Sequence, residues 1–79
     1  MGVYVRGIKI SEDASSVTYR YGTNYEAEGG GTFKIPKQNN LMEHYKTFVP
    51  TVAAWHVFKK VVKYYNEHGV FPDAVSFQS

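Results

Sequence analysis

The sequence contains no cysteine. This absence excludes a disulfide framework, a thiolate zinc site and a cysteine nucleophile. A domain this small without disulfides is typical of a reducing compartment. No apolar run is long enough to cross a bilayer, and the chain shows no signal-peptide pattern. We therefore expect a cytoplasmic protein that makes no use of a membrane.

An excess of charge of one sign is also lacking. Nine Lys and Arg residues face seven Asp and Glu residues, which gives a net charge of +2 over 79 residues. A chain with so little excess charge can bind nucleic acid only if its cations gather on one surface. Hydrophobic residues make up 43% and aromatic residues 16% of the chain, which is too apolar for disorder. We expect one small folded domain that spans residues 1–79.

The strongest pattern in the chain lies in residues 52–68 and has the period of an α-helix. Large apolar residues fall on one arc of the helical wheel and polar residues on the other. The apolar arc holds Ala54, Trp55, Val57, Phe58, Val61, Val62, Tyr64 and Tyr65, and the polar arc holds His56, Lys59, Lys60, Lys63, Asn66 and Glu67. Pro50 suits the first turn of this helix, and Gly69 suits its end.

Alternation of apolar and polar residues predicts three strands before this helix, joined by polar or glycine-rich turns. Their ranges are residues 3–10, 17–25 and 32–35. In the first strand, Val3 and Val5 have one parity, and Ile8 and Ile10 have the other. A β-bulge at residues 6–7 would bring all four side chains to the inner face. In the second strand, the inner face would hold Val17, Tyr19, Tyr21 and Tyr25.

The fold class that these elements predict is α+β. We expect a three-stranded antiparallel β-meander that is packed on one face by the long C-terminal amphipathic helix. Residues 41–47 have helical spacing and predict a short helix. Residues 74–77 are expected to add a short edge strand or to lay their aromatic side chain on the core.

The uncovered face of this sheet is the first candidate interaction surface. Strand parity places cations and one aromatic ring on it and no carboxylate: Tyr4, Arg6, Lys9, Arg20 and Lys34. Such a face could hold a phosphate backbone, because cations there would release counterions on binding. The alternative is a solvated face whose charges guard the sheet against edge pairing.

The polar arc of the helix is the second candidate surface, with His56, Lys59, Lys60 and Lys63 on neighbouring turns. These side chains could grip phosphates or an acidic partner. Any surface helix also has a charged outer face, so the pattern has an ordinary structural explanation.

Catalytic and metal-binding motifs are missing from the sequence. His44, His56 and His68 are spaced twelve apart, and His56 is expected to face solvent, so they cannot converge on one ion. No nucleophile elbow, phosphate-binding loop or paired-histidine motif is present. We therefore expect a protein that is not an enzyme and that has no metal and no cofactor.

Aromatic residues, in contrast, exceed what one helix on three short strands can cover. They are Tyr19, Tyr21, Tyr25, Phe33, Tyr45, Phe48, Trp55, Phe71 and Phe77. Either some of them are exposed for a partner or a second copy, or residues 37–50 and the C-terminal tail fold over them.

The order of three strands and a helix is similar, in topology alone, to the plant AP2-type DNA-binding domain and to the latter part of a double-stranded RNA-binding domain. The first needs a sheet dense in arginine and tryptophan, and the second needs lysines at the start of its final helix. This chain has neither, and it is assigned to no family.

The function predicted from the sequence is that of a small non-catalytic binding protein. It would dock on a macromolecule, foremost another protein, in the manner of bacterial or phage inhibitors, immunity factors and adaptors. A homodimer is compatible with the excess of aromatic residues. The alternative is a nucleic-acid-binding module that uses the basic face of the sheet.

Overall fold

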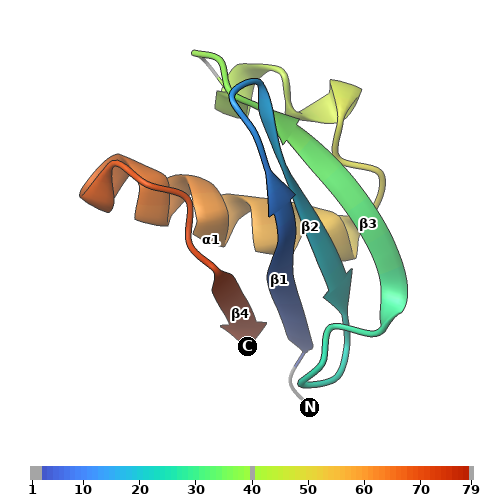
Figure 1. The fold of residues 1–79 in the computed structure, drawn as a ribbon. Coiled ribbons are helices and arrows are strands. Elements are labelled where there is room, and N and C mark those ends of the chain that lie inside the picture. The colour runs from blue at the N-terminus through green and yellow to red at the C-terminus, as the bar shows by residue number, and fades with distance from the viewer. Residues whose placement is uncertain (1–2, 40, 79) are drawn as a thin grey trace.

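The computed structural model describes residues 3–39 and 41–78. In this part the chain forms one antiparallel four-stranded sheet with a long helix across one of its faces (Figure 1). The strands are β1 (Tyr4–Glu12), β2 (Ser16–Gly22), β3 (Gly29–Pro36) and β4 (Ala74–Gln78), in the spatial order β3-β2-β1-β4. Between β3 and β4 lie two short 3₁₀ turns and the helix: η1 (Leu41–Glu43), η2 (Tyr45–Thr47) and α1 (Val52–His68).

The predicted α+β fold is confirmed, including the meander, the long helix and the C-terminal strand. Helix α1 has the predicted bounds because a capping residue lies at each of its ends. The Thr51 side chain accepts a hydrogen bond from the backbone N–H of Ala54 and so caps the first turn. Gly69 ends the helix in the left-handed conformation, with φ of 78°. Pro50 was predicted inside the first turn, but it precedes the Thr51 cap.

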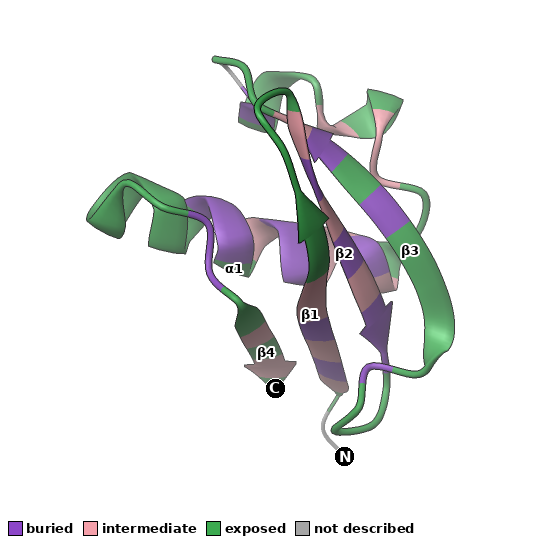
Figure 2. Cartoon of the chain, in the orientation of Figure 1, coloured by how far each residue is buried: buried purple, intermediate pink, exposed green. Residues whose placement is uncertain are grey.

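The core lies between α1 and the inner face of the sheet (Figure 2). Fully buried side chains from the helix meet fully buried side chains from β1, β2 and β3. They are Ala54, Val57, Phe58 and Val61 of α1, and Val5, Val17, Tyr19 and Ile35 of the sheet. The apolar arc that the sequence predicts is therefore the packed side of the helix, except that Tyr64 and Tyr65 are more than one-third exposed.

The predicted bulge in β1 is in the wrong place. The register of β1 against β2 shifts between Lys9 and Ser11, not at residues 6–7. Parity therefore continues through Gly7, whose missing side chain leaves room for Val57 of α1. Ile8 turns to the outer face, and Ile10 is 49% exposed at the bulge.

The connection from β2 to β3 also differs from the prediction. Strand β2 ends at Gly22, and a turn follows in which the Asn24 side chain accepts hydrogen bonds from the backbone N–H groups of Glu26 and Glu28. This turn takes Tyr25 away from the core, and its side chain is 65% exposed. The glycines that follow belong to β3 and not to the turn.

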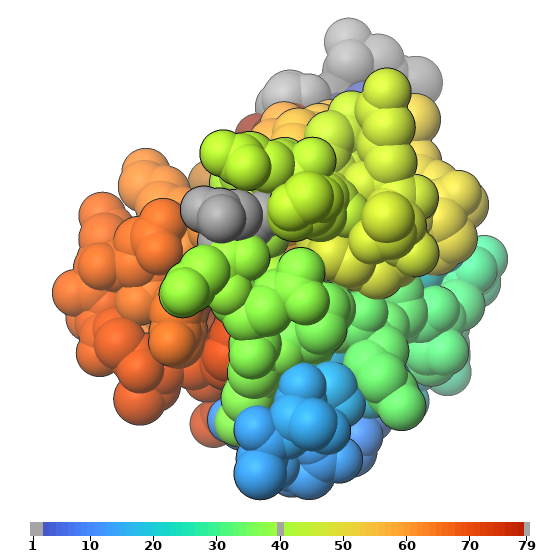
Figure 3. All heavy atoms as spheres, turned by 90° about the horizontal axis from the view of Figure 1, so that it is seen from above, coloured from blue at the N-terminus to red at the C-terminus, as the bar shows by residue number. Residues whose placement is uncertain are grey.

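Residues 41–49 pack their aromatic side chains against those of α1. They form two 3₁₀ turns where one short helix was predicted. The Tyr45 ring packs on Trp55 at 4.3 Å between centroids, and Phe48 packs edge-on against Phe58 at 5.3 Å. In the space-filling view, the yellow-green residues of this segment form a continuous layer at their end of the molecule (Figure 3).

Strand β4 is held on the sheet by its neighbours on the inner side. Val75 and Phe77 pair with Gly7 and Val5 of β1 and are half-buried. Just before the strand, the buried Tyr19 hydroxyl donates a hydrogen bond of 2.7 Å to the Pro72 carbonyl oxygen. The chain after α1 thus contacts the core at Pro72 and then forms β4, the edge strand next to β1.

Candidate functional site

The face of the sheet opposite α1 carries a row of polar and basic side chains. The β1–β2 and β2–β3 registers place Ile8 beside Arg20 and Arg20 beside Thr32, and they place Thr18 beside Lys34. We call this surface the outer face. It is made of Tyr4, Arg6, Ile8, Thr18, Arg20, Thr32 and Lys34, with Tyr25 from the β2–β3 turn next to Arg6.

Arg6 and Arg20 are held in place on the outer face by neutral groups. The Arg6 guanidinium lies over the Tyr25 ring at 4.6 Å from its centroid, a cation–π contact. Arg20 donates a hydrogen bond of 2.9 Å from Nη2 to the Glu26 carbonyl oxygen. The Nε atoms of both arginines are shielded from solvent and have no hydrogen-bond partner among the described residues. Much of their donor capacity is therefore unused.

No carboxylate of the described residues forms an ion pair with a cation of the outer face. The ion pairs that the described residues form involve only Lys9 and Lys37 as cations, with Glu12 and Asp73 as anions. Arg6, Arg20 and Lys34 therefore have no ion-pair partner within the described ranges. Their positive charge is available to an anionic partner.

Lys9 was predicted on the outer face, and its placement there is wrong. Because the bulge follows Lys9, its register partner is the core residue Tyr19, and its side chain lies on the helix side of the sheet. There the Lys9 ammonium pairs with Glu12 at 2.7 Å and with Asp73 at 3.3 Å. The hydrogen bond to Glu12 raises the pKa of Lys9. Lys9 is thus part of a structural ion-pair cluster.

Two residues of the outer face were missed. Ile8 was assigned to the core because the bulge was expected before it. Tyr25 was assigned to the inner face by extending the alternation of β2 past Gly22. The polar turn chemistry of the Asn24 region was the signal that could have ended the strand earlier.

The polar arc of α1 is divided by β4. Lys60 and Lys63 are exposed, as the periodicity predicts. His56 was expected to face solvent, but its ring stacks on Phe77 at 4.1 Å with an interplanar angle of 6°. Lys59 is half-buried, and its ammonium lies 5.2 Å from the Phe77 ring centroid and 5.6 Å from that of Trp55. Only Lys60 and Lys63 form an open basic surface.

His56 sits in an environment that disfavours its charged form. Burial, and in second place the nearby Lys59 ammonium, lower the pKa of His56. Its Nδ1 atom is shielded from solvent and has no partner among the described residues. Neutral His56 therefore fits the stack on Phe77 better than the imidazolium does.

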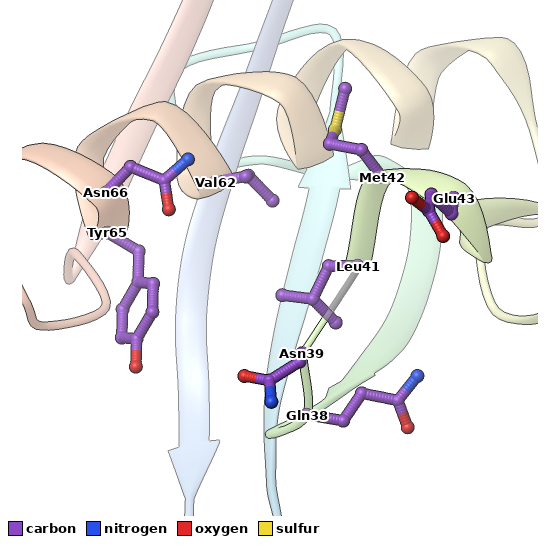
Figure 4. A pocket seen from close by; sticks show the side chains of 8 residues that line it. All are labelled: Gln38, Asn39, Leu41, Met42, Glu43, Val62, Tyr65 and Asn66. Carbon is purple, nitrogen blue, oxygen red and sulfur yellow. The ribbon is translucent and has the colours of Figure 1, made fainter.

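Metal binding and catalysis need side chains of suitable chemistry close together. Within residues 3–39 and 41–78, no group of three His, Cys, Asp or Glu side chains comes together. A depression of about 310 Å³ lies between α1 and residues 38–39 and 41–43 (Figure 4). Its described lining consists of amide, aliphatic, thioether and phenol groups with one carboxylate, that of Glu43.

The helices of the described ranges include none that is long and apolar enough to cross a membrane. The class that the coordinates define is a small α+β protein with a four-stranded antiparallel sheet open on one face. Comparison with known proteins gives no match to a family model, to a curated protein or to a solved structure.

Proposed function

We propose that this chain is a non-catalytic binding protein that docks on an acidic surface of another protein through its outer face. The observation that carries the proposal is the composition of that face. It carries two arginines, two tyrosines and Ile8, and no carboxylate of the described residues forms an ion pair with the arginines. Tyrosine and arginine are the side chains that most often supply binding energy at protein interfaces.

The sequence suggested docking because of its excess of aromatic residues, whereas the structure supports docking through the outer face. Most of the aromatic residues that prompted a docking role are buried in the core or half-buried against it, so they supply no exposed patch. Tyr25 is the exception, because its ring is 65% exposed and lies against Arg6. Arginines that are already held by Tyr25 and Glu26 lose less side-chain freedom on binding than free ones would.

Single-stranded nucleic acid is the second candidate for the outer face, favoured by the unpaired cations next to two rings. Its electrostatic part would be small. Three cations would give a slope of about −2 in log K against log salt, since each neutralised phosphate of a single strand contributes about −0.7. A protein partner with a few carboxylates suits three cations and an aliphatic centre better.

The test compares two charge reversals of equal size. Arg20→Glu changes the outer face, and Lys46→Glu changes an exposed lysine of η2. Tagged wild-type protein is used to capture partners at moderate salt, and the affinity of each purified partner is then measured by calorimetry. We expect Arg20→Glu to raise the Kd at least tenfold and Lys46→Glu to leave it within twofold.

The outcomes separate the two candidates. Captured material that nuclease removes, with an affinity slope near −2 in salt titrations, would assign the outer face to nucleic acid. Equal Kd values for the two variants would reject the outer face as the docking surface. Circular dichroism of both variants checks that the fold is retained.

A further inference from the structure

Strand β4 leaves one edge of the sheet unpaired. It is the last strand in the order β3-β2-β1-β4, so only β1 pairs with it among the described strands. The opposite edge, β3, is guarded by Lys34 and Pro36, which are residues that proteins use to block edge pairing. The sequence of β4, Ala-Val-Ser-Phe-Gln, contains no charged residue, proline or glycine.

The peptide groups that point outward from this edge can be assigned. The backbone N–H of Lys9 donates to the Asp73 carbonyl oxygen, which makes this a hydrogen-bonded pair at the start of the ladder. Hydrogen-bonded and non-hydrogen-bonded pairs alternate in an antiparallel ladder. Val75 and Phe77 therefore direct their peptide groups to β1, and Ser76 directs its own to the open edge.

A groove runs beside this edge. It has a volume of about 230 Å³ and lies between β4 and α1. Its lining consists of Lys60, Lys63, Tyr64, Glu67, Val75 and Ser76. Neither Lys60 nor Lys63 forms an ion pair in the described part of the chain. The groove thus combines free backbone groups with two ammonium groups and one carboxylate, that of Glu67, so its lining has a positive balance.

We propose that this edge and groove bind an extended acidic segment of a partner protein as an added strand. Main-chain hydrogen bonds to Ser76 would hold the segment on the sheet, as in other cases of strand addition. Alternate side chains of the segment would point toward α1, where its carboxylates would meet Lys60 and Lys63. Ser76 pairs with Arg6 of the outer face, but the groove lies on the helix side of the sheet, and the peptides and variants that test it differ from those that test the outer face.

A second copy of this chain fits the same edge less well. A two-fold axis between two β4 edges would place the Lys60 and Lys63 side chains of both copies on the two sides of one junction. Like charges brought together in this way cost free energy. Charge complementarity therefore favours an acidic segment over a homodimer.

The experiment uses two synthetic peptides of eight residues that alternate valine with glutamate or valine with lysine. Binding is followed by amide chemical shifts and by hydrogen exchange of the full chain. We expect the glutamate peptide to bind at least tenfold more tightly than the lysine peptide and to slow the exchange of the Ser76 amide. The Lys63→Glu variant should lose at least tenfold in affinity, and Lys46→Glu should lose less than twofold.

The backbone part of the proposal has its own variants. Ser76→Pro removes the outward N–H group without touching the β1 ladder, and we expect it to abolish binding. Ser76→Ala is the matched control and should bind normally. A glutamate peptide with N-methyl groups on alternate residues should fail to bind wild-type protein, which gives a test that needs no variant of the chain.

Three results would overturn the proposal. One is equal affinity for the two peptides, and another is unchanged affinity of the N-methylated peptide. The third is a dimer in sedimentation that Ser76→Pro converts to a monomer, which would assign the edge to a second copy.

Discussion

Gly7 allows α1 to pack directly on β1, and it does so because it has no side chain. A Cβ atom at this position would lie 2.4 Å from Cγ1 of Val57, which is buried. Val57 fills the space that a residue of β1 would otherwise occupy. Val57 of α1 therefore packs directly against the backbone of β1 at Gly7.

We predict that Gly7→Ala destabilises the protein by about 1–3 kcal/mol, the usual cost of overpacking a core. Unfolding in urea, followed by circular dichroism, measures this loss. Val57→Ala removes the clashing methyl groups, so the double variant should be less destabilised than the sum of the two single variants. Strict additivity of the two losses would contradict the contact.

Single residues also show where sequence reasoning fails. The sequence predicts that Arg6, Arg20 and Lys34 share the outer face, and the register confirms that they do. It misplaces Lys9 and Ile8, since their faces depend on where β1 bulges. The register shift lies between Lys9 and Ser11, and the alternation of apolar residues in β1 did not indicate that position.

At the scale of the secondary-structure elements, the first turn of α1 is stabilised by one side chain, that of Thr51. Thr51 caps the first turn through Ala54, and its hydroxyl also donates a hydrogen bond of 3.1 Å to the Tyr21 hydroxyl of β2. The cap therefore fixes the end of the helix to the sheet as well as satisfying a backbone donor.

We expect Thr51→Ala to cost about 1–2 kcal/mol, because it removes both hydrogen bonds. Thr51→Ser keeps the hydroxyl and should retain most of the stability. Urea midpoints of the two variants provide the comparison. If Thr51→Ser lost as much as Thr51→Ala, the hydroxyl would not be the stabilising group.

Elements whose signals are local could be predicted, and those that depend on pairing could not. The bounds of α1 follow from its period and from its end signal at Gly69. The place of β4 next to β1, on the far side of the sheet from β3, has no local signal. The groove between β4 and α1 forms because β4 pairs with β1. The sequence predicted that Lys60 and Lys63 are exposed, but it did not predict a groove beside them.

The whole molecule should lose stability as the pH falls. Burial lowers the pKa of His56 from its ordinary 6.5, so the unfolded chain binds a proton first. The stability due to neutral His56 is complete above pH 6.5 and declines as the pH falls from there through the folded-state pKa. Hydrogen bonds from Lys37 lower the pKa of Glu12, and backbone hydrogen bonds from Ser15 lower that of Asp13. Their contribution is lost below about pH 4.5.

Stability measured against pH checks this prediction. We expect the unfolding free energy to fall below pH 6.5 with a slope of at most about 1.4 kcal/mol per pH unit, because one proton is involved. His56→Gln should remove this slope and leave the decline below pH 4.5. A wild-type stability that stays constant between pH 7 and pH 5 would contradict the stacking of neutral His56 on Phe77.

The pairing of β4 with β1 connects segments from opposite ends of the described chain. Closing a connection of this length costs more conformational entropy than forming the hairpins β1–β2 and β2–β3. We therefore expect β4 to join the sheet last during folding and to leave it first during local opening. Each opening exposes the peptide groups of Val5 and Gly7, so the unpaired edge of the sheet moves inward from β4 to β1.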